Sequence, residues 1–129
     1  MSVTPPPTCR GRVLVVDAQR VARLTIKLLL GIEGYTVVEA DTHDKALAEL
    51  ARGVDLMLVR LKSMNALELI PRAVAVAPYL RIIVMTLWGA EEEAKAAVRC
   101  GACNEYMMLP FKEGELIERV ERLIKQVKP

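Results

Sequence analysis

The sequence predicts one α/β domain, a doubly wound sandwich in which helices cover both faces of a parallel sheet. Short apolar runs rich in β-branched residues alternate with segments of helical periodicity, and this order implies right-handed crossover connections. Two of the runs, 13–16 and 56–59, are apolar throughout, which is typical of central parallel strands. The 129 residues, 53% of them apolar, suit a single core and exclude both a multidomain enzyme and a disordered chain.

The apolar runs place the strands of this sheet. In chain order, the five predicted strands are 12–16, 35–40, 56–59, 81–86 and 105–108. The segment before the first strand contains Pro5, Pro6 and Pro7 and has no apolar periodicity. We therefore expect residues 1–11 to be a flexible proline-rich leader and residues 12–127 to form the domain.

Four of the five helices are predicted from apolar stripes of helical spacing. The last helix is the clearest, with six apolar residues on one face: Leu116, Ile117, Val120, Leu123, Ile124 and Val127. Similar stripes mark the first, second and fourth helices: Val21, Leu24 and Leu28; Ala46, Leu47 and Leu50; Ala94, Ala97 and Val98. Gly53 and Gly101 are suited to end the second and fourth helices. Pro71 lies inside the run 65–76, so the third helix either spans this run or begins near Pro71.

Charge and composition exclude several classes of function. The 18 basic and 16 acidic side chains give a net charge of +2, too small to indicate a nucleic-acid surface. A basic stripe on the first helix, Arg20, Arg23 and Lys27, is interpreted as a solvated face. The sequence contains neither a run of about 20 apolar residues nor a signal peptide, so we expect a cytoplasmic protein. Three cysteines without a secretory context indicate reduced thiols.

The carboxyl ends of the strands form the expected functional edge of such a sheet. Five segments resemble those of a response-regulator receiver domain, in the same order: VLVVD at 13–17, YTVVEA at 35–40, IIVMT at 82–86, GA at 101–102 and YMMLPF at 106–111. The resemblance covers about residues 12–127. It implies a flavodoxin-like fold with strand order 2-1-3-4-5 and a non-enzymatic role in two-component signal transduction.

The resemblance also implies a phosphorylation site, from which this sequence departs. The family accepts phosphate on an Asp after the third strand and holds Mg²⁺ with that Asp and two acidic residues after the first strand. A Lys after the fifth strand binds the phosphoryl oxygens. At these positions the sequence has Arg60, Asp17, Ala18 and Leu109, and the loop after Arg60 is two residues shorter. We therefore expect phosphotransfer and Mg²⁺ binding to be lost, and no other metal or cofactor.

The charges that remain suggest a new pairing at the same place. Because a buried charge needs a partner, we expect Arg60 to pair with Asp17 where the cation would lie. The alternative is that Arg60 extends from a vacant pocket into solvent. Thr86 and Tyr106, the family's conformational switch pair, are retained, while Leu87 replaces a small residue and would restrict movement of Thr86.

Large apolar residues indicate where a partner could bind. Trp88, Tyr106, Met107 and Phe111 fall around the fourth helix, fifth strand and last helix, a face that receiver domains use for docking or dimerisation. We expect a protein partner or a second copy of the chain at this face, with ordinary core packing as the equal alternative. No membrane or direct nucleic-acid partner is expected.

Cys100 and Cys103 form a C-x-x-C motif, which makes a thiol redox protein the alternative from another functional class. The motif closes a helix instead of opening one, so packing explains it more simply. Zinc is not favoured, because Cys9, His43 and the motif have no metal-finger spacing. His43 is expected to be solvated at the start of the second helix.

The sequence thus predicts an atypical receiver domain that lacks the phosphoacceptor Asp and acts as a phosphorylation-independent protein-interaction module. Two alternatives stay open. The chain could be the N-terminal regulatory domain of a larger response regulator or transcription factor, or it could be a thiol redox protein that uses Cys100 and Cys103.

Overall fold

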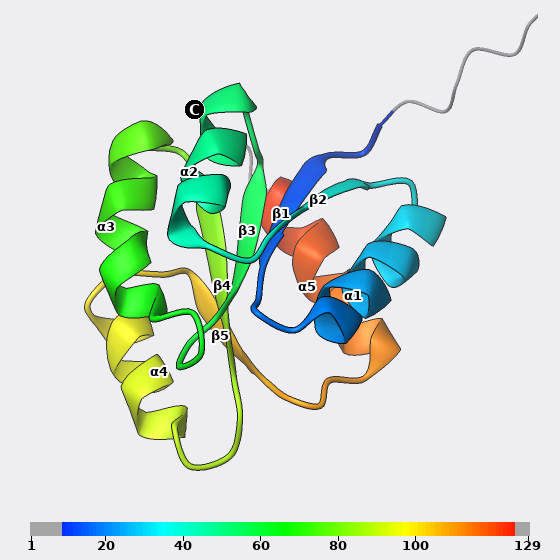
Figure 1. The fold of residues 1–129 in the computed structure, drawn as a ribbon. Coiled ribbons are helices and arrows are strands. Elements are labelled where there is room, and N and C mark those ends of the chain that lie inside the picture. The colour runs from blue at the N-terminus through cyan, green and yellow to red at the C-terminus, as the bar shows by residue number, and fades with distance from the viewer. Residues whose placement is uncertain (1–8, 126–129) are drawn as a thin grey trace, which may run out of the picture.

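Five parallel strands form one sheet at the centre of the protein, in the order β2-β1-β3-β4-β5 (Figure 1). The computed structural model describes residues 9–125. The strands are β1 Arg12–Val16, β2 Thr36–Ala40, β3 Leu56–Arg60, β4 Arg81–Thr86 and β5 Glu105–Met108. The predicted flavodoxin-like fold and strand order are confirmed, and each strand boundary lies within one residue of its predicted place.

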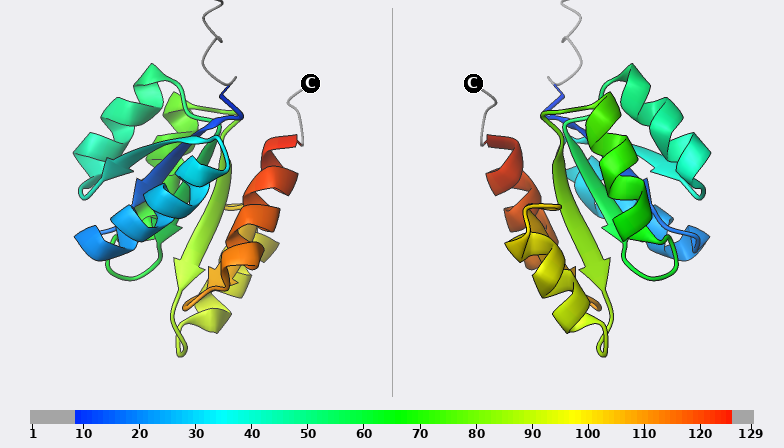
Figure 2. Two further views of the ribbon diagram at one scale, coloured as in Figure 1. Left: turned by 90° about the vertical axis from the view of Figure 1, so that its right-hand side faces the viewer. Right: turned by 90° about the vertical axis from the view of Figure 1, so that its left-hand side faces the viewer.

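Helices cover both faces of the sheet (Figure 2). They are α1 Arg20–Ile32, α2 His43–Arg52, α3 Ala66–Val76, α4 Glu91–Arg99 and α5 Glu113–Lys125. Successive residues of a strand point to opposite faces, so each central strand supplies two core layers. Leu14 and Met57 pack with the layer under α2, α3 and α4, whereas Val13 and Leu58 pack with the layer under α1 and α5.

The register of the strands brings their carboxyl ends to one edge of the sheet. Val16 of β1 lies beside Val59 of β3, and Arg60 lies beside Met85 of β4. Thr86, the last residue of β4, lies beside Met108 of β5. The residues that follow or end these strands are therefore neighbours in space, although more than 90 residues separate the first from the last.

α3 settles the ambiguity about Pro71. The helix is continuous over Ala66–Val76 with Pro71 inside it, so the alternative that it begins near Pro71 is wrong. The missing N–H of Pro71 deprives only the Leu67 carbonyl of its helical donor, and both residues are exposed, where water can replace that bond. The opposite face of α3 is buried and holds the helix to the sheet.

α1 departs from the prediction. Ile26 and Leu30 are its buried residues, whereas the side of the helix with the predicted stripe faces solvent. Val21 is 76% exposed, Leu24 42% and Leu28 66%. The helix is apolar on two sides, so periodicity alone could not tell which side meets the sheet.

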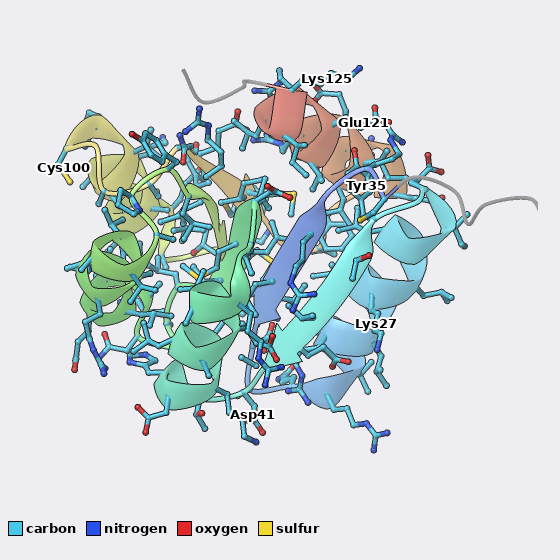
Figure 3. All side chains as sticks on the ribbon, turned by 90° about the horizontal axis from the view of Figure 1, so that it is seen from above. Lys27, Tyr35, Asp41, Cys100, Glu121 and Lys125 are labelled. Carbon is cyan, nitrogen blue, oxygen red and sulfur yellow. The ribbon has the colours of Figure 1, made fainter. Side chains whose placement is uncertain are left out.

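The start of the described chain is attached to the domain. Arg10 donates a backbone hydrogen bond to the Gly34 carbonyl, contacts Glu121 at 2.7 Å and lies 4.9 Å from the ring centre of Tyr35. Figure 3 labels Tyr35 and Glu121. Residues 1–8 of the predicted leader, and Val127 of the predicted last helix, lie outside the described residues. Within residues 9–125, no helix is long and apolar enough to cross a membrane.

Candidate functional site

A buried ion pair occupies the carboxyl edge of the sheet. Arg60, the last residue of β3, places Nη2 2.9 Å from Oδ2 of Asp17, which follows β1. The Asp17 side chain is fully buried and that of Arg60 is only 13% exposed. The predicted pairing is confirmed, and the alternative in which Arg60 extends into solvent is wrong.

The two carboxylate oxygens of Asp17 differ in their hydrogen bonds. The backbone N–H of Gln19 donates to Oδ1 at 2.9 Å, and Nη1 of Arg23 donates to the Asp17 backbone carbonyl at 2.7 Å. The contact between Oδ2 and Arg60 has ion-pair distance without hydrogen-bond angles. Oδ2 of Asp17 and Nε of Arg60 therefore have no hydrogen-bond partner among the described residues.

The other predicted site residues lie around this pair. Thr86 is buried, and its hydroxyl donates to the neighbouring Leu87 carbonyl at 3.2 Å. Leu109 is buried as well, with its backbone N–H bonded to the Thr86 carbonyl at 2.8 Å. Ala18 is exposed and adds only a methyl group. The predicted site residues thus supply one carboxylate and one guanidinium, with an aliphatic side chain at the position where the resemblance implies a Lys.

Two hollows border the ion pair, and Arg60 and Leu87 contribute to both. The first, here called the α1 groove, has a volume of about 450 Å³ and runs between α1 and the segment after β5. Its other lining residues include Ala22, Thr25, Leu109 and Phe111. The second has about 360 Å³ and contains Thr86 and Trp88.

The shortened loop after β3 is held by a bond that the sequence did not predict. His43, the first residue of α2, is half-buried and places Nε2 2.6 Å from the Met64 carbonyl oxygen. A carbonyl can only accept, so Nε2 carries the proton. The expectation that His43 is solvated is wrong, because its side chain is half-buried and donates to a backbone carbonyl of this loop.

The residues predicted for a partner face divide into two groups. Trp88 is 77% exposed, and the Tyr106 hydroxyl lies 3.4 Å from Oε2 of Glu91 on α4. Met107 is fully buried under α5 and cannot contact a partner. Phe111 is half-buried and lines the α1 groove. For Met107 the alternative of core packing therefore holds, whereas partner contact through Phe111 stays a prediction.

The alternation of side chains along β5 explains why the prediction chose Met107 and missed Met108. If Met107 points inward, Tyr106 and Met108 point to the other side of β5, and both line a hollow of about 320 Å³ with Glu105 and Arg119. Side chains alternate in direction along the predicted strand 105–108, and this alternation would have separated Met107 from Tyr106 and Met108. This face also carries an ionic cluster, defined as Glu105, Glu115, Glu118, Arg119 and Arg122.

Glu105 is the centre of the ionic cluster. It accepts from Arg119 at 2.9 Å and also pairs with Arg122. Hydrogen bonds to Glu105 and Glu118 raise the pKa of Arg122 above its usual value. The same contact with Arg122 lowers the pKa of Glu118.

The two thiols of the C-x-x-C motif differ in their surroundings. All three are free thiols. Burial raises the pKa of the Cys103 thiol to about 11, which keeps it protonated and a poor nucleophile at neutral pH. Cys100, labelled in Figure 3, is exposed and contacts the Ala97 carbonyl within its own turn. In the part of the chain that the structure describes, no group of three or more His, Cys, Asp or Glu side chains is placed to hold a metal.

Comparisons with known proteins extend these observations. The chain is 34% identical over 125 residues to transcriptional regulatory protein AruR of Pseudomonas aeruginosa, which covers 91% of this chain and 50% of that protein. It is 31% identical over 124 residues to response regulator MprA of Mycobacterium leprae, with 92% and 53% covered. The chain spans about half the length of these relatives.

Solved structures agree with the fold. A response regulator from Thermotoga maritima superimposes with a TM-score of 0.80 at 28% identity, over 90% of this chain and 98% of that one. The family model described as the response regulator receiver domain matches residues 13–121, from the first strand into the last helix. With its sheet order, its retained Thr86 and Tyr106 and this match, the chain belongs to the response regulator receiver domain family.

Proposed function

We propose that this receiver domain works as a phosphorylation-independent protein-interaction module. The Asp17–Arg60 ion pair carries the proposal. It puts the Arg60 guanidinium, 2.9 Å from the Asp17 carboxylate, at the end of β3, where the family's acceptor carboxylate would stand. A guanidinium cannot form an acyl phosphate, and it stays protonated at any ordinary pH.

The residues at this edge do not fit Mg²⁺. That ion requires several oxygen ligands in near-octahedral geometry, whereas the site offers the carboxylate of Asp17 alone, already in contact with Arg60. Ala18 and Leu109 supply no ligand. A divalent cation would also meet the positive charge of Arg60 within a few ångströms.

Intact mass spectrometry after incubation with acetyl phosphate and Mg²⁺ tests the proposal. We expect an unchanged mass, with and without reductant. A phosphoryl adduct would overturn the proposal, whereas a reductant-reversible loss of two hydrogens would favour the thiol alternative.

Restoring the acceptor provides a sharper test. The Arg60→Asp variant should remain unphosphorylated, because Ala18 and Leu109 still omit a metal ligand and the phosphate-binding Lys. Phosphorylation of this single variant at the rate of a conventional receiver domain, run in parallel, would contradict the account. The triple variant with Ala18→Asp and Leu109→Lys measures how far the shortened loop adds to the loss.

The face formed by α4, β5 and α5 is the proposed docking surface, for a signalling partner or a second copy. Its support is the hollow beside Tyr106 and Met108 together with the ionic cluster around it. Sedimentation velocity tests the second copy: a concentration-dependent dimer that Met108→Glu abolishes and Val76→Glu on α3 preserves is expected. A monomer at all concentrations would leave only a different protein as partner.

A regulatory role within a larger protein is the second candidate. It is favoured by the length of the relatives, because the match covers only 50% of AruR and 53% of MprA. The proposed location is the cytoplasm, which agrees with three free thiols. Mass determination of the endogenous protein would decide whether an output domain accompanies this chain.

A further inference from the structure

The outer side of α1 is an apolar surface that nothing in the described chain covers. Val21, Leu24, Leu28 and Ile32 recur at helical spacing and share one face, here called the α1 stripe. They are 76%, 42%, 66% and 72% exposed. The 13 residues of the helix give this row a length of about 20 Å. Scattered exposed apolar residues are ordinary, whereas a contiguous row along one helix marks an interaction site.

Every charged residue of α1 is a cation. The helix contains Arg20, Arg23 and Lys27 and neither Asp nor Glu. At 3.6 residues per turn, these cations lie on one flank of the α1 stripe. A helix with an apolar row and a basic flank has the pattern of helices that lie in the surface of a membrane.

The basic flank keeps a net positive charge in the folded domain. Arg23 contacts Oε1 of Glu39 at 3.0 Å, and Lys27 lies 3.6 Å from Oε2 of the same carboxylate. Arg20 is exposed and forms no ion pair within residues 9–125. Three cations thus share one carboxylate, so positive charge remains next to the stripe.

The carboxylates that border α1 in the chain are each paired with a cation. Asp17, before the helix, is buried against Arg60. Oε1 of Glu33, after the helix, lies 3.9 Å from Nη1 of Arg10. Figure 1 shows α1 at the right-hand side of the molecule, with no other helix beyond it. The stripe and its basic flank can therefore meet a flat surface of negative charge.

These features favour a membrane over a second copy of the chain. A second α1 would bring three further cations and no carboxylate. An anionic bilayer supplies an apolar interior for the stripe and negative headgroups for the flank, and it requires no matching shape. The expectation of no membrane partner rested on the lack of a long apolar run, which excludes a spanning helix but not one that lies in the surface.

We infer that α1 binds the surface of an anionic phospholipid bilayer, with the α1 stripe among the acyl chains and Arg20 and Lys27 among the phosphate groups. Ile26 and Leu30 on the inner side of the helix hold it to the sheet, so the domain stays folded while the outer side meets lipid. This binding goes beyond the proposed function and does not depend on it, because it involves neither phosphate transfer nor a protein partner.

Co-sedimentation with lipid vesicles tests the inference. The probes are large unilamellar vesicles of phosphatidylcholine alone and of equal parts phosphatidylcholine and phosphatidylglycerol. We expect saturable binding to the vesicles that contain phosphatidylglycerol, weaker at high salt, and binding to phosphatidylcholine alone that is weaker by about tenfold or more. Equal binding to both kinds of vesicle, or binding to neither, would overturn the inference.

Matched variants locate the binding surface. Leu28→Glu should weaken binding to the anionic vesicles by about tenfold or more, and Arg20→Gln by about fivefold. Val76→Glu on α3, where the side chain is 45% exposed, and Arg52→Gln on α2 make the same kinds of change elsewhere and should have no effect. Circular dichroism checks that every variant is folded. Loss with Val76→Glu, or none with Leu28→Glu, would contradict the location.

A tryptophan placed on the stripe reports its depth. In a Trp88→Phe background, the emission of Leu28→Trp should shift to shorter wavelength with anionic vesicles and should be quenched by lipids brominated on their acyl chains. Val76→Trp in the same background should show neither change. Unchanged emission of Leu28→Trp would overturn the inference even if the protein co-sediments, because attraction to headgroups alone does not bury the stripe.

Two measurements without lipid separate this inference from its alternatives. In sedimentation velocity, a dimer that Leu28→Glu dissociates would show that a second copy covers the stripe, and it would overturn the inference. In mass spectrometry, a phosphoryl adduct would refute the proposed function and leave vesicle binding unchanged. The inference and the proposed function therefore fail separately.

Discussion

Two ionic regions of this domain have the same chemistry and opposite surroundings. The Asp17–Arg60 pair is enclosed at the carboxyl edge of the sheet, with exposed fractions of 0% and 13%. The ionic cluster around Glu105 lies on the α4, β5 and α5 face, where the Arg122 side chain is 43% exposed. Solvent screens the second region and not the first, so similar distances correspond to different energies.

The difference teaches what each region can do. A buried pair resists rearrangement, because separating its charges leaves one of them without compensation. An exposed cluster exchanges partners at little cost, which suits a docking face. In this chain the Asp17–Arg60 pair makes the carboxyl edge of the sheet the rigid region, whereas the exposed charges beside β5 can exchange partners.

Breaking the buried pair should give the largest effect. Arg60→Met leaves the Asp17 carboxylate buried, with the backbone N–H of Gln19 as the remaining donor to that carboxylate, and we expect a loss of about 3–5 kcal/mol in the free energy of unfolding. Urea unfolding followed by far-ultraviolet circular dichroism measures it. A loss below about 1 kcal/mol would mean that the pair is open in solution.

A double variant is the control for that measurement. Asp17→Asn together with Arg60→Met removes both charges, so most of the lost stability should return, with a coupling energy of about 2–3 kcal/mol. Simple addition of the two single effects would show that Arg60 contributes packing and not charge.

Glu105→Gln should have a smaller effect. It weakens contacts with Arg119 and Arg122 on the surface, and we expect a loss of about 1 kcal/mol or less. High salt should reduce this difference between wild type and variant, while the Arg60→Met effect stays unchanged. Equal salt sensitivity of the two variants would remove the contrast between the regions.

The smallest expected effect is a pH dependence at Glu118. Its hydrogen bond with Arg122 lowers the pKa of Glu118 below the usual 4.5, so the folded state favours the charged form. The stabilisation is complete above pH 4.5 and is lost as the pH falls through the lowered pKa. Wild type should therefore melt slightly above Glu118→Gln at neutral pH, and the difference should vanish in acid. A difference that persists in acid would argue against the ion pair.

The fold was predictable because several signals agreed along the chain. α5 was placed correctly since its apolar residues occupy one side, which leaves a single way to pack. α1 has apolar residues on two sides, and only the sheet decides that Ile26 and Leu30 turn inward. When the sequence pattern of a helix allows two orientations, its packing against the rest of the protein decides between them.

The site was predictable where charge balance left one solution. Arg60 and Asp17 were expected to pair because a buried charge needs a partner, and the structure places them 2.9 Å apart. Met107 and His43 were misjudged for different reasons. The orientation of Met107 follows from strand alternation, which motif spacing ignores, and the Met64 carbonyl that holds His43 is a backbone group that side-chain patterns cannot show.

The exposure of Trp88 has a consequence for spectroscopy. It is the sole tryptophan of the chain and lies 77% exposed in the loop after β4. Its emission should already resemble that of a tryptophan in water, so unfolding will change the spectrum little. A partner that covers Leu87 and the neighbouring hollow would shift the emission to shorter wavelength. The indole is therefore a native optical reporter of occupancy at this edge and an insensitive reporter of stability.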